Sequence, residues 1–150
     1  MTTAQVEALR DLYEQDETAW LERTAEFIQQ RRFGELDYAN LAVYLCDMAR
    51  RDRREVKSRL MILLAHLLKW EQQPDRRSGS WAATIQLQQE EFADLASSGV
   101  LRNHAEAVLS DAYDKAVKQA ALETERSASD FPAECPYSVE DLIRLDQLPE

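Results

Sequence analysis

The 150-residue chain is poor in the residue types that build most recognisable active sites. It contains three glycines, four prolines, two cysteines and two histidines. Phosphate-binding loops need several glycines within a few residues, and Gly34, Gly79 and Gly99 lie too far apart to form one. The low glycine and proline content also excludes collagen-like and low-complexity chains, and a hydrophobic content of 45% excludes a natively unfolded one.

The few cysteines and histidines do not have the spacing of a metal site. Cys46 and Cys135 are far apart in the sequence and match no ligand spacing. We therefore expect them to be reduced thiols in a reducing compartment. The residues three positions before His66 and His104 are leucines, so the Glu-x-x-His pair of di-iron helical bundles is absent. We therefore expect no catalytic residue set, no metal and no cofactor.

Long apolar runs are missing as well. The longest mostly apolar stretch, residues 60–68, is much shorter than the roughly 20 residues that a membrane-spanning helix needs. The first residues also lack the basic and apolar regions of a secretory signal. We expect a cytoplasmic protein that does not associate with membranes.

The chain does contain helical periodicity from end to end. Apolar residues recur at a spacing of three and four in residues 2–32, 37–73, 80–97 and 101–125, and no segment shows the alternation of a strand. The pattern predicts an all-α fold in a single helical-bundle domain, residues 1–150. We expect four to five main helices and a short C-terminal helix.

Polar residues and glycines mark where these helices begin and end. Thr2 with Gln5 has the form of a capping box for the first helix. Gly34 is placed as the left-handed residue that ends this helical region, and Asp37 as the N-cap of the next helix. Ser80 is the expected N-cap of the third helix.

The second helical segment, residues 37–73, is unusually long and contains neither glycine nor proline. A straight helix of that length would span about 55 Å, whereas a compact 150-residue domain is about 38 Å across. We therefore predict a kinked or broken helix near residues 50–54. Tyr38, Leu41, Leu45 and Met48 form one face of its first part.

One group of residues combines a titratable ring with the tryptophans. His66 lies in the most apolar stretch, where it is either a general base in a cleft or a neutral core residue bonded to a backbone carbonyl. Trp70 and Trp81 flank the loop around Pro74, either as packing residues or as part of a partner-binding patch. The candidate functional cluster consists of Trp20, His66, Lys69, Trp70 and Trp81.

Charge is unevenly distributed along the chain. The net charge is −10, but residues 50–77 hold nine basic residues against four acids, a net of +5, which leaves −15 on the rest. This basic strip would form salt links with acidic helices, associate with a second copy, or bind nucleic acid. The overall acidity and the lack of interleaved aromatics argue against nucleic acid. The strip consists of Arg50, Arg51, Arg53, Arg54, Lys57, Arg59, Arg76 and Arg77, with Lys69 in the same segment.

Several segments keep an order and spacing found in a known group of bacterial proteins. They are LYEQD (12–16) and AW (19–20), LD (36–37) and NLA (40–42), LAHLLKW (64–70) and QP (73–74), SW (80–81) and FPAECPYS (131–138). Over nearly its whole length the chain resembles the bacterial domain-of-unknown-function family numbered twenty-nine. The resemblance implies a small all-helical bundle with no established activity. Where that family tends to carry glutamates on its second helix, this chain has Val43, Tyr44 and Cys46.

These observations predict an uncharacterised small bacterial helical protein that acts as a non-catalytic protein–protein interaction module. Its partner would be another protein or a second copy in a homodimer. One alternative is an enzyme or ligand-binding protein with a cleft around His66. The other is a nucleic-acid-associated protein that uses residues 50–77.

Overall fold

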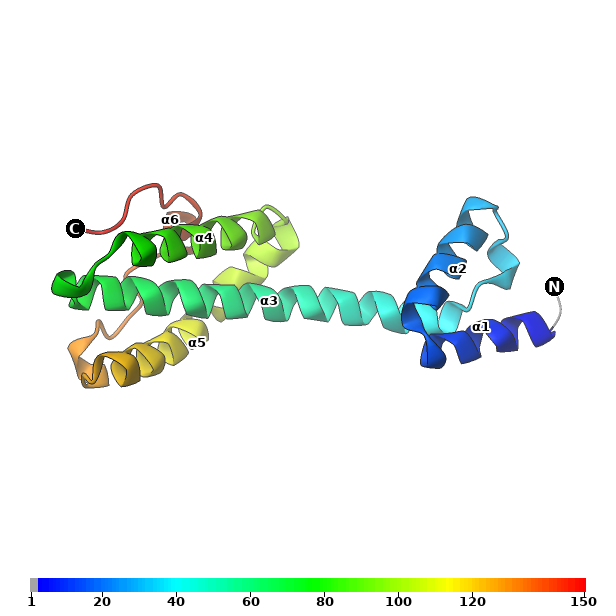
Figure 1. Cartoon of the computed structure of the whole chain (residues 1–150), viewed down its shortest axis with the longest axis horizontal. Helices are drawn as coiled ribbons and strands as arrows, with labels where there is room; N and C mark the ends of the chain where they lie inside the picture. Colours follow the sequence, from blue (N-terminus) through cyan, green and yellow to red (C-terminus); the bar gives the residue numbers. More distant parts are fainter. Residues whose placement is uncertain (1–2) are drawn as a thin grey trace. The chain divides into compact units, whose positions relative to one another are not determined.

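The fold is all-α in the computed structural model, which describes the backbone of residues 3–150 and the side chains of residues 8–150. Within those residues six α-helices and three short 3-10 turns follow one another, and no strand occurs (Figure 1). The helices are α1 (Thr3–Gln15), α2 (Glu17–Gln29), α3 (Tyr38–Gln72), α4 (Gly79–Leu95), α5 (Gly99–Thr124) and α6 (Val139–Ile143). The all-α prediction, with four to five main helices and a short last one, is confirmed.

The chain forms two compact units, residues 1–50 and residues 51–150. The first unit contains α1, α2, a 3-10 turn at Phe33–Glu35 and the first residues of α3. The second contains the rest of α3 with α4, α5 and α6. The single-domain expectation for residues 1–150 stays a prediction.

The first unit has a small core. Its buried apolar residues are Leu9, Trp20, Phe27 and Leu36. Asp16 separates α1 from α2, and its side chain accepts a hydrogen bond from the backbone N–H of Ala19, which caps α2.

The second unit has a larger core. The C-terminal part of α3 lies between α4 and α5 (Figure 1) and buries an apolar stripe at Val56, Leu60, Leu63, Leu64, Leu67 and Leu68. α4 contributes Ile85 and Phe92, and α5 contributes alanines at 105, 112, 116 and 120, whose small side chains permit close helix approach. α6 adds Val139 and Leu142.

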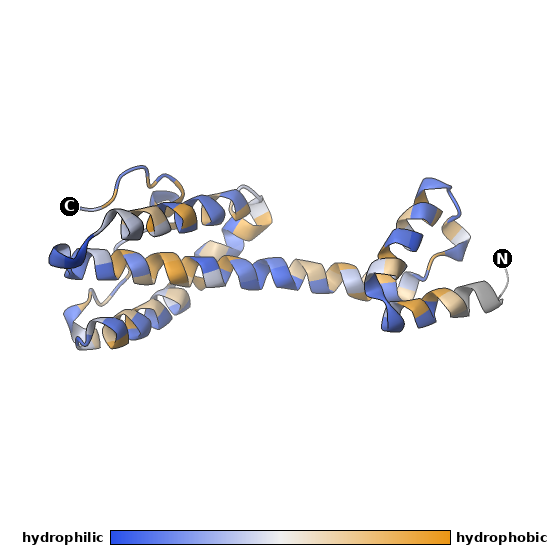
Figure 2. Ribbon diagram, in the orientation of Figure 1, coloured by the Kyte–Doolittle hydropathy of each residue, from blue (hydrophilic) through white to orange (hydrophobic). Residues whose placement is uncertain are grey.

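α3 runs unbroken from Tyr38 to Gln72, so the predicted break near residues 50–54 is wrong. The prediction assumed that the whole helix had to fit inside one compact domain, whereas the boundary between the two units falls within α3. Arginine is a good helix former, and no glycine or proline interrupts the segment. Figure 2 shows this hydrophilic stretch of α3 with more hydrophobic stretches before and after it along the helix.

The helix ends differ from the predictions in two places. Arg31, with φ 60°, and not Gly34, is the left-handed residue after α2. The N–H of Arg31 donates to Ile28 at 3.0 Å and that of Arg32 to Phe27 at 2.8 Å, the two bonds of a Schellman motif. Gly34 lies instead inside the 3-10 turn.

α4 is capped by Ser78 and not by Ser80, because its first helical residue is Gly79. Asp37 does cap α3, since its Oδ1 accepts from the backbone N–H of Asn40 at 3.3 Å. The Thr2 capping box lies outside the described residues. Among the described helices, none combines the length and apolar character needed to cross a bilayer.

Candidate functional site

The predicted functional cluster is distributed over both units. Trp20 belongs to the first unit, where its side chain is 0% exposed and its ring lies 4.8 Å from Tyr13 and 5.8 Å from Tyr44, centroid to centroid. The indole Nε1 is buried and has no hydrogen-bond partner among the described residues. Trp20 is therefore a core residue of the first unit, with one polar atom left unsatisfied.

The other two tryptophans meet in the second unit, at the end of α3 and the start of α4. The rings of Trp70 and Trp81 are 5.8 Å apart in an edge-to-face arrangement, and the guanidinium of Arg77 lies 4.7 Å from the Trp70 ring. Arg77 Nε also donates to the Trp70 carbonyl at 2.9 Å, and Trp70 Nε1 donates to the Pro149 carbonyl at 2.8 Å. These contacts hold together the α3–α4 connection and the C-terminal segment, as the packing hypothesis expects.

His66 is half-buried on α3. Its Nδ1 lies 2.8 Å from the carbonyl oxygen of Ile62, one turn earlier, and donates a hydrogen bond to it. One turn along the helix, Lys69 Nζ donates to Glu123 of α5. This hydrogen bond lowers the pKa of Glu123, with a smaller contribution from His66. Glu123 is therefore an ionised partner of Lys69, which leaves it poorly suited to accept a proton from substrate.

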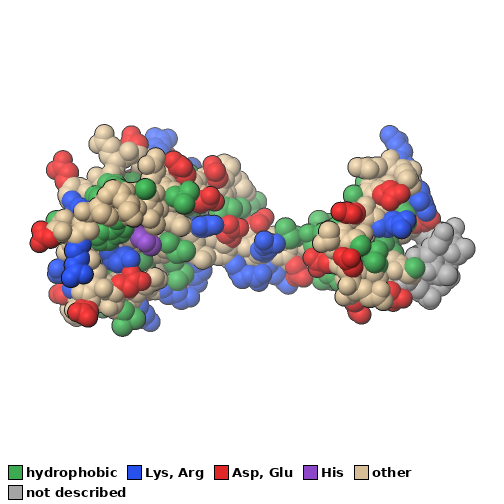
Figure 3. Space-filling view, viewed as in Figure 1, with side chains coloured by type: hydrophobic (Ala, Val, Ile, Leu, Met, Phe, Trp, Pro, Cys, Tyr) green, Lys and Arg blue, Asp and Glu red, His purple; other side chains and the backbone are tan. Residues whose placement is uncertain are grey.

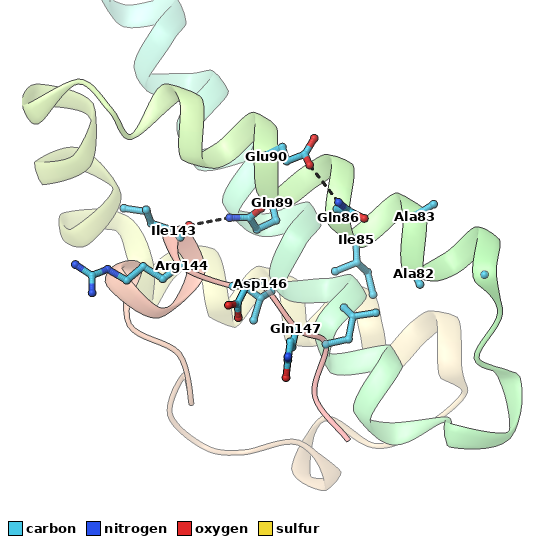
Figure 4. Close-up of a pocket in the computed structure, with 13 residues that line it drawn as sticks. Ala82, Ala83, Ile85, Gln86, Gln89, Glu90, Ile143, Arg144, Asp146 and Gln147 are labelled. Carbon is cyan, nitrogen blue, oxygen red and sulfur yellow. Dashed lines mark hydrogen bonds between the residues drawn. The ribbon is translucent and has the colours of Figure 1, made fainter.

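A cavity of about 790 Å³ lies between α4 and the C-terminal segment and does not include His66. Ile85 and Gln89 line it from α4, opposite Ile143 and Gln147 (Figure 4). Gln89 Nε2 donates to the carbonyls of Leu142 at 3.2 Å and Ile143 at 2.8 Å. The amide nitrogen of Gln89 thus fastens the C-terminal segment to α4.

Part of the basic strip is engaged within the second unit. Lys57 Nζ donates to Asp111 of α5, and this bond lowers the pKa of Asp111. Together with the pair Lys69–Glu123, this bond joins α3 to α5. Salt links between the basic strip and an acidic helix are one of the three roles that the sequence suggests for the strip. Because the pKa of Asp111 is depressed by folding, this stabilisation is present above the carboxylate's unfolded pKa and is lost as the pH falls through its folded pKa.

Some of the remaining arginines pair within α3 itself. Arg50 lies 3.6 Å from Asp47 and Arg59 lies 3.7 Å from Glu55, both between charged atoms. Ion pairs near the surface, such as these two, contribute little to the stability of the fold. Arg76 is exposed and has no ion-pair partner among the described residues.

The turn of α3 at residues 51–54 holds three further arginines of the strip. Within the described residues Arg51, Arg53 and Arg54 make no salt bridge, and Arg51 and Arg54 are exposed. Figure 3 shows Lys and Arg side chains gathered along this part of α3. We call residues 51–54 the basic turn.

Immediately before the basic turn, α3 presents an apolar surface that the sequence analysis missed. Tyr38 and Leu45, which share one side of the helix with Leu41, are 58% and 59% exposed, whereas Leu41 packs against the core of the first unit. We call this surface the exposed α3 face; it comprises Tyr38, Ala42, Val43, Leu45, Cys46 and Ala49, all of them exposed.

A sequence signal for this face was present. Apolar residues occupy nearly every position from 38 to 49, which is more than one side of a helix can bury against α1 and α2. Cys46 is a free, exposed thiol on this face, whereas the free thiol of Cys135 in the second unit is half-buried.

Residues 131–138, which carry part of the family resemblance, are fixed to the second unit. Phe131 is buried, and the Tyr113 hydroxyl on α5 donates to the Pro132 carbonyl. The Tyr137 hydroxyl donates to Glu71 on α3, and burial together with this carboxylate raises the pKa of Tyr137. The segment thus joins α3 and α5 through partly buried polar contacts.

Comparison with known proteins gives one match. The model of the family described as domain of unknown function DUF29 matches residues 12–148. The chain belongs to the DUF29 family. The match confirms the resemblance found in the sequence, and it covers α2 to α6 with part of α1. No curated protein and no solved structure matches the chain.

Proposed function

We propose that this DUF29 chain is a non-catalytic protein–protein interaction module and that the exposed α3 face is its contact surface. The observation that carries the proposal is the exposure of Tyr38, Val43 and Leu45 on one short helical segment. Continuous exposed apolar patches are uncommon on proteins that act alone and are typical of interaction sites.

The composition of the face supports this role. The six residues that define it carry no charge, and interface centres are depleted in charged residues. The basic turn follows directly on the same helix, so an uncharged centre is bordered by charged residues. That arrangement resembles the apolar centre and polar rim of protein interfaces.

The alternatives have weaker support. An enzyme with His66 as base would need a substrate cavity at Nε2, whereas the cavity of about 790 Å³ is lined by residues of α4 and the C-terminal segment and not by His66. For nucleic acid, the basic turn offers a few unpaired arginines on a chain of net charge −10. The proposal also places the protein in the bacterial cytoplasm, supported by its two free thiols.

Site-specific photo-crosslinking in bacterial cells tests the proposal. A benzophenone amino acid replaces Tyr38, which is 58% exposed on the same side of α3 as Leu45, or Leu87, which is 54% exposed on α4 and serves as the matched control. We expect a protein adduct at position 38 and little at position 87. We also expect Leu45→Glu to remove the adduct at position 38, because a carboxylate cannot be buried there without a partner. An absence of adducts at position 38 would overturn the proposal.

A further inference from the structure

We infer that the occupant of the exposed α3 face is a second copy of this chain, with the two α3 helices packed antiparallel. The inference rests on the proposed function and adds the partner. It is carried by two features: the order of large and small residues on the face, and the positions of the unpaired charges on either side of it.

The order of side-chain sizes makes the face complementary to itself. Tyr38, Ala42, Leu45 and Ala49 follow one another at helical spacings of four, three and four. In an antiparallel pair centred between positions 43 and 44, Tyr38 faces Ala49 of the second copy, and Ala42 faces its Leu45. Each large side chain meets a small one, which is how facing helices interdigitate. A two-fold symmetric contact of this kind uses the same surface on both copies.

The charges favour the antiparallel orientation over the parallel one. In this register the basic turn of one copy falls opposite residues 33–36 of the other, within the first unit. Residues 1–50 contain five basic and ten acidic residues, a net of −5. Exposed carboxylates of that unit that have no ion-pair partner among the described residues are Asp11, Glu14, Asp16, Glu17, Glu22 and Glu26.

A parallel pair would instead place one basic turn against the other. Charges of this kind contribute mainly to orientation and association rate and less to affinity. The apolar centre therefore provides the binding energy, and the basic turn selects the direction of packing.

The expected dimer is weak. Residues 38–49 span about 17 Å of helix, so the contact is smaller than the roughly 800 Å² per partner of a standard interface. We therefore expect a dissociation constant on the order of micromolar.

Sedimentation velocity on the full chain, from about 1 to 300 µM, tests self-association directly. We expect the sedimentation coefficient of the unmodified chain to rise with concentration. Leu87→Glu, which changes an equally exposed leucine on α4, should dimerise like the unmodified chain. Leu45→Glu should weaken dimerisation at least tenfold, with an unchanged helical circular dichroism spectrum. A chain that stays monomeric throughout, or equal dimerisation of both variants, would overturn the inference.

A second measurement tests the orientation without relying on Leu45. A spin label at position 58, in the variant Ser58→Cys with Cys46→Ser and Cys135→Ser, reports the separation of the two copies. The antiparallel register predicts about 45 Å between the labelled backbones, and a parallel pair about 10 Å. A separation of about 10 Å, the value for a parallel pair, would overturn the inference. The charge reversal Arg51→Glu with Arg54→Glu should raise the dissociation constant of the dimer severalfold.

The two proposals can fail separately. A monomeric chain whose position 38 still crosslinks a different protein in cells would overturn the dimer and leave the interaction module standing. A monomeric chain without any adduct at position 38 would overturn both.

Discussion

The two units show how differently one type of sequence pattern can be used. Both are built from amphipathic helices, yet among the described residues the first unit has four buried apolar residues, whereas the second has an extended core. The first unit makes up a third of the chain, but five of the eight exposed large hydrophobic residues in the described part of the chain lie in it: Ile28, Phe33, Tyr38, Val43 and Leu45. A small unit has too little interior for its apolar surface, so part of that surface remains available to a partner.

α3 shows the same contrast within one helix. In the second unit its stripe at Leu60, Leu63 and Leu67 is covered by helices on both sides and is fully buried. In the first unit Leu41 is partly covered, while Tyr38 and Leu45 remain exposed. The number of helices packed around each segment decides this difference, since the spacing of apolar residues is similar in both.

The largest expected effect compares the two cores through the same substitution. Phe92→Ala removes a fully buried ring from the second unit. It should lower the free energy of unfolding by about 5 kcal/mol, the upper end of the usual range for such a substitution. Phe27→Ala should cost an amount near the bottom of that range. Phe27 is 8% exposed and borders Arg32, whose guanidinium lies 4.2 Å from the ring and can move into the space. Urea unfolding of the two variants measures both changes in the free energy of unfolding. Equal losses of stability in the two variants would contradict the comparison.

The next effect concerns how the two units are coupled through α3. Arg51→Pro removes a helical hydrogen bond at the boundary between the units and should cost about 3 kcal/mol, whereas the control Arg51→Ala should cost little. If residues 1–150 behave as one domain, unfolding reported by Trp20 and by the pair Trp70 and Trp81 coincides before the substitution and separates after it.

Fluorescence of the chain with and without Trp20→Phe distinguishes the two reporters, because Trp20 is the tryptophan of the first unit. Two separate transitions in the unmodified chain would show that the single-domain prediction is wrong.

The smallest effect compares the helix ends, where we expect the two units to behave alike. Arg31 after α2 and Glu125 after α5 both adopt a left-handed backbone, with φ of 60° and 54°. Replacing either with glycine should raise the free energy of unfolding by about 0.5–1 kcal/mol, because glycine adopts this conformation without steric cost. Alanine at the same positions serves as the control and should give no gain. A loss of stability with glycine, measured by thermal unfolding, would contradict this prediction.

Much of the fold could be predicted from local signals. Asp37 is predictable as an N-cap, because a short carboxylate directly before a helix can accept a hydrogen bond from a free backbone N–H of the first turn. Arg31 was not recognised as a left-handed residue, because Gly34 is the better residue for that conformation and the actual end of α2 depends on its packing. The predicted break in α3 failed for a similar reason, since it rested on the size of a domain and not on the residues of the helix.

Within the candidate sites, only contacts between neighbours were predictable. The pairing of Trp70 with Trp81 follows from a short connection between two helices, and the structure has it. The exposure of Leu45 and the isolation of Trp20 in the first unit could not be predicted, because both depend on how many helices surround a given face.

The sequence by itself determined the helices, the N-cap of α3 and the family, because these depend on residues close together in the chain. It also determined the segregation of charge along α3. Only the tertiary structure decided that this helix belongs to two units and that one apolar face of it is left uncovered. Burial depends on the packing of segments distant in sequence, and periodicity alone carries no information on whether a partner helix is present.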